Sequence, residues 1–384
     1  MDFKLLEKTL SDHAQPRFRA RQVWAWAARG AAGFEQMTDL PGALRATLAE
    51  RVPFSSLALQ VETRAGDGTV KALFRTADGH PLEAVMMSYP ARSAARVRRS
   101  VCLSSQSGCP LTCTFCATGA MRFARNLSAS EIVDQALHFR RSCELDGPLP
   151  SNCVFMGMGE PLLNLDSVLA ACQRLPDLGI SHRHTAISTV GWIPGIDALA
   201  EQEMPLRLAL SVHAAEEALR SQLMPVNERH PLRDVIDACR AFYARKRRRV
   251  FVEYVMLAGV NDSYAQALEL ARLLSGPERS TAERRPCATR TRRAPGGPQD
   301  SASRDERNAA AIFKVNLIPY NPISATRPGR ENGSPHPAYS GSTPAAIAAF
   351  REALRSRGIP TTVRLTRGRE IAAACGQLAG KDAP

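Results

Sequence analysis

Three cysteines in one short loop constrain what this chain can fold into more than any other feature. Cys109, Cys113 and Cys116 have the spacing C-x3-C-x2-C, and Gly108 and Pro110 keep the segment irregular. A structural zinc site needs four protein ligands, usually as two separated Cys/His pairs. Three thiolates can instead hold three irons of a four-iron cluster and leave the fourth iron open. A zinc site with a distant fourth ligand and chance clustering among the ten cysteines are the alternatives.

An open iron can chelate the amino and carboxylate groups of S-adenosylmethionine (SAM) and reduce its sulfonium. That reaction generates a 5′-deoxyadenosyl radical. The cysteine pattern is similar to the signature of the radical SAM enzymes. The resemblance implies two cofactors, a four-iron–four-sulfur (4Fe–4S) cluster and SAM.

Composition favours a nucleic-acid partner. The chain has 384 residues, a net charge of +13 and a pI of about 9.6, values that suit a polyanionic partner. No apolar run approaches the roughly 18 residues of a membrane span, and the first residues have no apolar signal-peptide core. Ten cysteines without a secretory signal favour a reducing compartment, where clustered thiols are more often metal ligands or catalysts than disulfides. We therefore predict a cytoplasmic protein that does not contact a membrane.

Residues 1–88 are predicted to form a small N-terminal accessory domain. The segment from Pro16 to Trp26 is typical of an amphipathic helix, with Phe18, Gln22 and Trp26 spaced by four. The simplest interpretation of its Trp and Phe is the core of a small helical unit, although its three arginines could contact phosphate. Short strands are expected over 69–75 and 82–89.

Residues 89–384 are predicted to form the catalytic domain, because strand-like and helix-like runs alternate from about residue 98 onward. Helices are expected over Leu165–Leu175 and from Pro231 to about Lys246. This alternation predicts an α/β fold, a partial (β/α)6 barrel, whose reactive groups belong at the carboxyl ends of the strands. The cluster loop follows the first of them. The expected strands are Val101–Ser104, Cys153–Met158, Thr185–Thr189, Leu206–Val212, Val250–Leu257 and Val315–Pro319.

One segment interrupts this alternation. Residues 276–311 are rich in Arg, Pro, Ser, Thr and Ala and nearly empty of large apolar side chains. Such a segment cannot bury enough apolar surface to fold, so we predict a disordered insertion in the catalytic domain.

Polar residues after the later strands are the candidate contacts to SAM. Gly159 and Glu160 follow the second strand, where glycines let the backbone approach a ligand and the carboxylate can accept from an amino group. Taken singly, each candidate could equally be a satisfied polar residue in a turn. The remaining candidates, at the ends of the third, fourth and sixth strands, are Ser188, Ser211, Val212, His213 and Asn321.

Two further cysteines stand apart from the cluster loop. Cys375 lies among small residues with Gly376 behind it, so its sulfur could be unhindered on a mobile loop. Cys102 lies on or beside the first strand, seven residues before Cys109. A lone cysteine is usually a small buried hydrophobe. We predict that role for Cys143, Cys153, Cys172 and Cys239.

Four stretches together are similar to one family. The chain closely resembles the RlmN/Cfr family of radical SAM RNA methyltransferases, over nearly its whole length outside 276–311. It departs at Ala372, where members usually carry an acidic residue. The matching stretches are CLSSQSGC at 102–109, MGMGEPLLN at 156–164, NLIPYNP at 316–322 and AACGQLAG at 373–380.

The resemblance implies a mechanism at an adenine ring carbon. Cys375 takes a methyl group from one SAM and becomes S-methylcysteine. A radical from a second SAM removes a hydrogen from that methyl, and the resulting methylene radical adds to the adenine carbon. Cys102 then attacks Cys375, which releases the product and leaves a Cys102–Cys375 disulfide. Glu83 matches the family's proton acceptor, with an exposed strand carboxylate as the alternative interpretation.

The resemblance also implies the substrate and partners. We predict methylation of carbon 2 of an adenosine in 23S rRNA, with a tRNA anticodon-loop adenosine as a further candidate. The chain is expected to be a monomer that contacts RNA through its N-terminal domain and takes electrons from a donor such as flavodoxin. The alternatives are the carbon-8 branch, which confers antibiotic resistance, an iron–sulfur RNA-binding protein without turnover, and a radical activase that modifies protein.

Overall fold

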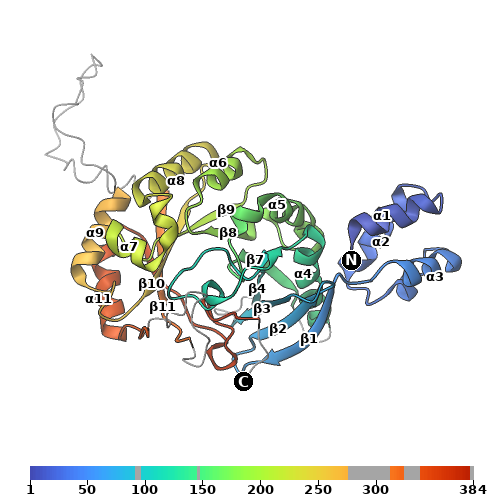
Figure 1. Cartoon of the computed structure of the whole chain (residues 1–384), viewed down its shortest axis with the longest axis horizontal. Coiled ribbons are helices and arrows are strands. Elements are labelled where there is room, and N and C mark those ends of the chain that lie inside the picture. The colour runs from blue at the N-terminus through green and yellow to red at the C-terminus, as the bar shows by residue number, and fades with distance from the viewer. Residues whose placement is uncertain (91–96, 145–147, 276–311, 324–337, 381–384) are drawn as a thin grey trace, which may run out of the picture.

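A single ten-stranded sheet forms the centre of the molecule (Figure 1). The structure is a computed structural model, and it describes residues 1–90, 97–144, 148–275, 312–323 and 338–380. The predicted insertion over 276–311 lies outside the described residues. The strand order is β1-β2-β3-β4-β7-β8-β9-β10-β11-β12. Within the described residues the two edge strands, β1 and β12, do not pair with each other, so the sheet is open.

Seven neighbouring strands of this sheet run parallel. The six predicted strands are all present, and β12 is a seventh that was not predicted. Helices lie along the outer face of the curved sheet in Figure 1, so the predicted α/β partial barrel is confirmed. The parallel strands are β4 (Arg98–Cys102), β7 (Pro150–Phe155), β8 (Thr185–Thr189), β9 (Arg207–Ser211), β10 (Val250–Met256), β11 (Phe313–Pro319) and β12 (Thr361–Val363).

The outer helices follow the expected apolar spacing. In α8 (Leu232–Lys246), for example, Val235, Ile236 and Cys239 are buried on one face. The four cysteines predicted to be buried hydrophobes, Cys143, Cys153, Cys172 and Cys239, are all fully buried. The other outer helices are α4 (Ala129–Glu144), α5 (Leu165–Arg174), α6 (Ile193–Glu201), α7 (Glu217–Leu223), α9 (Tyr264–Ser275) and α11 (Pro344–Arg355). None of the described helices has both the length and the apolar composition needed to span a bilayer.

The sheet continues across the predicted domain boundary at residue 88. The antiparallel strands β1 (Leu57–Arg64), β2 (Val70–Thr76) and β3 (Pro81–Tyr89) extend it, and β3 pairs with β4 from Val85–Cys102 to Tyr89–Arg98. Because backbone hydrogen bonds join these strands to the barrel, residues 57–89 share its sheet. The division of the chain into two domains at residue 88 stays a prediction.

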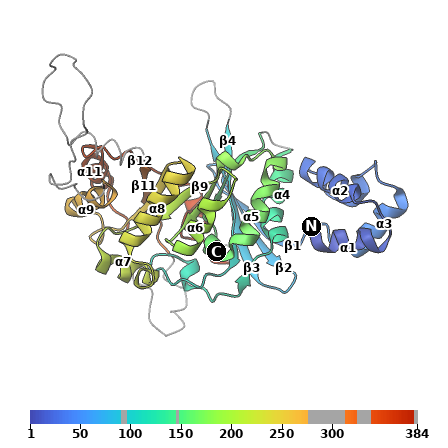
Figure 2. The same cartoon turned by 90° about the horizontal axis from the view of Figure 1, so that it is seen from above.

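The N-terminal helices α1 (Phe3–Asp12), α2 (Phe18–Arg29) and α3 (Gly42–Arg51) stand to one side of the sheet (Figures 1 and 2). They dock on the barrel through Trp24, whose indole N–H donates to Asp177 at 2.6 Å. The helix predicted near residues 16–26 exists, but its predicted face is wrong. The buried face contains Val23, Trp24, Ala27 and Ala28, and Phe18 is 47% exposed.

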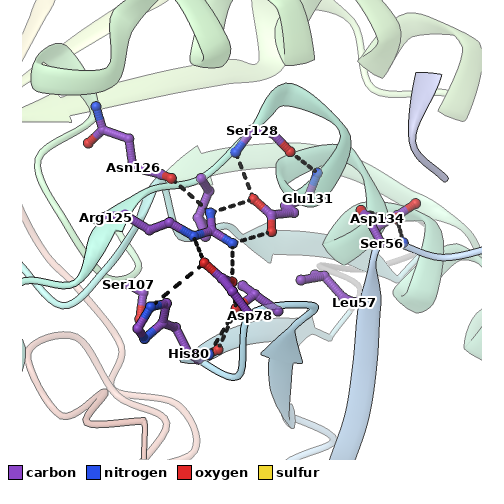
Figure 3. A network of polar contacts seen from close by, with 12 residues as sticks. Ser56, Leu57, Asp78, His80, Ser107, Arg125, Asn126, Ser128, Glu131 and Asp134 are labelled. Atoms are coloured by element: carbon purple, nitrogen blue, oxygen red, sulfur yellow. Dashed lines mark hydrogen bonds and ion pairs between the residues drawn. The ribbon is translucent and has the colours of Figure 1, made fainter. Parts of the chain in front are cut away.

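One arginine ties the β2–β3 turn to the segment that follows the cluster loop (Figure 3). The guanidinium of Arg125 donates to both oxygens of Asp78, at 2.6 and 2.7 Å, and to both oxygens of Glu131, at 2.7 and 2.9 Å. Glu131 also accepts from the backbone N–H of Ser128 at 2.8 Å, which caps the start of α4. The short strands β5 (Gln106–Ser107) and β6 (Arg125–Asn126) pair beside this network.

Candidate active site

The three cysteines of the C-x3-C-x2-C loop line one cavity at the carboxyl ends of the strands. Cys113 is buried, and Cys109 and Cys116 are half-buried. Burial raises the pKa of the Cys109 thiol to about 12 and that of Cys113 well above its ordinary value. Buried thiols of this kind lose their protons to a bound metal, because coordination stabilises the thiolate. Cys102, Cys109, Cys113, Cys116 and Cys375 are all free thiols.

The thiols suit a cluster better than a single ion. The described residues contain no group of three or more His, Cys, Asp or Glu side chains that could hold one metal ion. Three thiols that line one cavity fit a 4Fe–4S cluster, because each thiolate then binds a different iron. Gly108 (φ +74°) shapes the loop, since a Cβ there would lie 2.2 Å from the carbonyl oxygen of Arg122.

The loop after β7 forms a neighbouring wall of the same cavity. Gly159 has a φ of +97°, and a Cβ there would lie 2.5 Å from the Gln106 side chain, so the approach requires glycine. The buried carboxylate of Glu160 accepts from the N–H of Val190 at 2.9 Å and from that of Leu162 at 3.1 Å. Burial outweighs these hydrogen bonds and raises the pKa of Glu160 to about 7.

The next strand ends supply three more of the predicted residues. Ser188, Ser211 and His213 line the cavity, whereas Val212 and Asn321 are not among its lining residues. The Val255 N–H donates to Nδ1 of His213 at 3.0 Å, so the neutral ring carries its hydrogen on Nε2. Burial lowers the pKa of His213 to about 3, which keeps the ring neutral.

A second cavity, of about 490 Å³, lies in the interior of the barrel. It is lined by Cys102 and by Cys375, and Asn321 belongs to it. Cys375 also lines the first cavity. The two cavities share five lining residues, which are Met156, Glu253, Ile318, Cys375 and Leu378. Cys375 therefore lies at the wall between the cluster loop and the barrel interior.

The loop that carries Cys375 is anchored to the cluster segment. Ala117 donates its N–H to Gly376 O at 2.8 Å, and the Thr118 hydroxyl donates to Leu378 O at 2.7 Å. Ala372, where the chain departs from the family, has a φ of +49°. Cys375 is exposed as a residue, and the loop that carries it is held by these hydrogen bonds.

An ion pair that was not predicted joins β10 to the residue directly after β12, and it lies beside the two thiols. Arg364 Nε is 3.6 Å from Glu253 Oε2, and Asn316 donates to the other carboxylate oxygen at 2.9 Å. Although Cys375 as a residue keeps exposed surface, the surrounding protein atoms remove water from its sulfur and raise the pKa of the thiol to about 11. The positive charge of Arg364 opposes that shift. The available signal was Glu253 itself, a lone charge within the apolar strand Val250–Met256.

Glu83 is buried, so the interpretation of an exposed carboxylate is wrong. One oxygen lies 3.0 Å from Lys71 Nζ, and the other accepts the N–H groups of Ala379 at 2.6 Å and Gly380 at 3.1 Å. Glu83 is not among the residues that line either cavity.

Three cations lie near the amino ends of the strands, at the end of the barrel interior away from the cluster loop. Arg98, Arg207 and Lys314 lie at the amino ends of β4, β9 and β11 and line the second cavity. Burial and the nearby Arg98 lower the pKa of Arg207. Among the lining residues in the described part of the chain, Glu253 is the one acid. We call Arg98, Arg207 and Lys314 the basic rim.

Comparison with known proteins agrees with this site. Residues 103–271 match the radical SAM superfamily, and residues 1–53 match the ribosomal RNA large subunit methyltransferase N-terminal domain. A dual-specificity RNA methyltransferase RlmN from Anaeromyxobacter sp. is 40% identical, with 99% of this chain and 89% of the relative covered. A probable one from Chloroflexus aurantiacus is 43% identical, with 99% and 92% covered.

A solved structure supports the same conclusion. The radical SAM methyltransferase from Sphaerobacter thermophilus superposes with a TM-score of 0.81 at 38% identity, covering 99% of this chain and 98% of that one. Identity and coverage of this extent confirm the predicted resemblance, and with it the 4Fe–4S cluster and SAM as the family's cofactors. The chain belongs to the RlmN family of radical SAM RNA methyltransferases.

Proposed function

We propose that this chain methylates carbon 2 of an adenosine in 23S rRNA through an S-methylcysteine at Cys375. The observation that carries the proposal is the position of Cys375 in the lining shared by both cavities, with Cys102 in the second. A thiol at that wall can meet a methyl donor on one side and an acceptor base on the other.

The first cavity is proposed to hold the cofactors. Cys109, Cys113 and Cys116 would bind three irons, and Gly159 and Glu160 would meet the SAM amino group. When bound, the cluster supplies the electron that cleaves SAM to a 5′-deoxyadenosyl radical. The other residues of this cavity, Ser188, Ser211 and His213, would contact the rest of SAM, while Val212 and Asn321 would act through the backbone and the Cys375 loop.

Cys375 and Cys102 divide the remaining chemistry. Cys375 Sγ first displaces the methyl group of one SAM and becomes a thioether. Once the CH2 group has been joined to the adenine and the adduct has lost one electron and the ring proton, Cys102 attacks Cys375 Sγ. The bond between that sulfur and the CH2 carbon breaks, its electron pair stays with the carbon, and the carbon takes up a proton to become the methyl group. The methylated base leaves, and an external reductant returns the Cys102–Cys375 disulfide to two thiols. Glu83 is proposed to accept the ring proton.

The basic rim supports an RNA substrate that enters from the amino ends of the strands. The proposed cofactor cavity lies at the carboxyl ends, and the lining of the second cavity includes the basic rim as well as Cys102 and Cys375. Cations at that mouth would contact phosphates on either side of an unstacked adenosine, as in other enzymes that act on single bases.

The choice of substrate rests on the family match. The relatives named above are described as RNA methyltransferases RlmN of dual specificity, which supports two kinds of RNA substrate. Carbon 2 is proposed because the chain resembles the RlmN branch more closely than the carbon-8 branch. We therefore include a tRNA anticodon-loop adenosine beside 23S rRNA. An electron donor such as flavodoxin, a monomeric state and a cytoplasmic location stay predictions.

Nucleoside analysis tests the proposal. Anaerobically reconstituted enzyme is incubated with SAM, a reductant and unmodified 23S rRNA or tRNA. The RNA is then digested, and its nucleosides are separated by chromatography and identified by mass spectrometry. We expect 2-methyladenosine, and none from Cys375→Ala. Dominant 8-methyladenosine would move the chain to the carbon-8 branch, and the absence of any methylated adenosine would favour a non-catalytic RNA-binding protein.

A further inference from the structure

A buried ion pair holds the C-terminal end of the Cys375 loop. Lys71 in β2 and Glu83 in β3 have side-chain exposures of 6% and 2% and approach to 3.0 Å. Such a pair is expensive to bury unless the remaining lone pairs of the carboxylate are used. The second oxygen of Glu83 accepts hydrogen bonds from the backbone N–H groups of Ala379 and Gly380, which follow Cys375 by four and five residues.

The direction of the Glu83 side chain follows from the strand register. Val85 pairs with Cys102, and Met87 and Tyr89, two and four residues beyond Val85, line the barrel interior with Cys102. Because side chains two residues apart share a face, Glu83 points toward the same face, nearer the cluster end. Leu378 lines both cavities, whereas the carboxylate of Glu83 lines neither. Residues 379–380 therefore cap a carboxylate that would otherwise face the interior.

The hairpin that carries this pair is itself fixed. Arg125 binds Asp78 at the β2–β3 turn (Figure 3), and Ser107, two residues before Cys109, donates to Pro81 O at 2.7 Å. Ser104 donates to Glu83 O at 2.5 Å. The ion pair thus joins a rigid hairpin, attached to the cluster segment, to a loop that is 296 residues away in sequence.

We propose that Lys71 is a positioning residue. Its ion pair with Glu83 holds residues 379–380 through their N–H groups, an arrangement that we call the latch. The latch sets where Cys375 lies between the two cavities. While the latch is closed, the carboxylate is engaged by two N–H groups and shielded from the base. Glu83 becomes available to the ring proton when residues 379–380 leave it. This inference rests on the proposed function for its consequence, but the latch itself can be measured without turnover.

The rate at which Cys375 is methylated distinguishes a residue that positions the loop from a residue that acts only as a base. That step precedes any contact with adenine, so a residue that only accepts the ring proton has no effect on it. Lys71→Met leaves a buried carboxylate without its cation, and we expect the loop to detach more often. Amide hydrogen exchange at residues 379–380 should rise by about tenfold or more, because charge-assisted hydrogen bonds are lost. The rate of Cys375 methylation, read from intact protein mass, should fall by a similar factor.

Two other variants keep the test decisive. Lys71→Arg preserves the cation and should retain most of both properties. Ala379→Pro removes one N–H from the loop side and leaves the hairpin intact, so it replaces Lys71→Met if that protein fails to bind iron. Unchanged methylation and unchanged exchange at Gly380 in either variant would overturn the latch. Absence of Cys375 methylation in the unmodified enzyme would instead reject the proposed function, while the exchange measurement still decides the latch.

Discussion

The two ends of the barrel interior differ in charge and in chemistry. At the carboxyl ends of the strands lie the three cluster thiols and a carboxylate, Glu160, around a small cavity. At the amino ends lie the cations of the basic rim. The same strands are thus proposed to carry a site for a metal cluster at one end and a site for a polyanion at the other. Cys375 lies where the two meet, so radical generation and RNA binding are predicted to be separable by mutation.

The largest effect is expected at the carboxyl end. Cys109→Ala, Cys113→Ala or Cys116→Ala should each reduce bound iron from about four atoms to little or none and abolish SAM cleavage, because the cluster loses one of three ligands. Iron and sulfide analysis and the charge-transfer absorbance check this. RNA affinity should be unaffected. Stoichiometric zinc without that absorbance would contradict the assignment.

Replacing each of the two thiols between the cavities should block the reaction at a different step. Cys102→Ala should accumulate a covalent RNA–protein adduct, because no thiol is left to resolve it. Cys375→Ala should form none, because the methyl carrier is missing. Denaturing gels with labelled RNA distinguish the two results. Equal adduct-free turnover in both variants would rule out the two-thiol mechanism.

Resolution of the adduct should depend on pH. Burial, and next the charge on Cys375, raises the pKa of Cys102 to about 12. The second contribution disappears once Cys375 is a thioether, but burial remains. The nucleophilic thiolate is then a minor species at neutral pH, and its fraction should rise by about tenfold per pH unit. Decay of the adduct in quenched samples from pH 7 to 9 measures this. A flat profile would show that a protein base, not solvent, activates Cys102.

The smallest effect is expected at the amino end. Combined replacement of Arg98, Arg207 and Lys314 by alanine should weaken RNA binding about tenfold and lower the salt dependence by about one phosphate contact per residue. A matched control removes three exposed arginines from the outer helices, Arg233, Arg272 and Arg355. Equal loss in both triple variants would show that net charge, and not the rim, attracts RNA.

Sequence reasoning succeeded where the signal was local. The cluster cysteines are close in the chain, and the buried strand Val250–Met256 is apolar except for Glu253, so both were found. The strand Leu57–Arg64 was missed because half of its residues are polar and most of them are exposed, and Thr361–Val363 because it has only three residues. Spacing alone misled at α2, since apolar side chains occur on both of its sides and only docking selects the buried one.

Contacts between distant segments could not be predicted. Lys71, Glu253 and Arg364 acquire their roles from partners on other strands or on the C-terminal loop. A lone charge within an apolar strand indicates that such a partner exists, but it does not say which residue it is. The position of Glu83 under residues 379–380 likewise required the three-dimensional arrangement.

The wall shared by the two cavities has an evolutionary consequence. Five residues are shared by the lining of the proposed cofactor cavity and that of the proposed RNA cavity, and the amino-end cations do not contribute to the lining of the former. Substitutions at the amino ends can therefore accumulate and change which RNA, or which face of the base, is presented, while inherited radical chemistry is preserved. Lineages that diverge in substrate should differ first at that end of the strands and last at the cysteine loop.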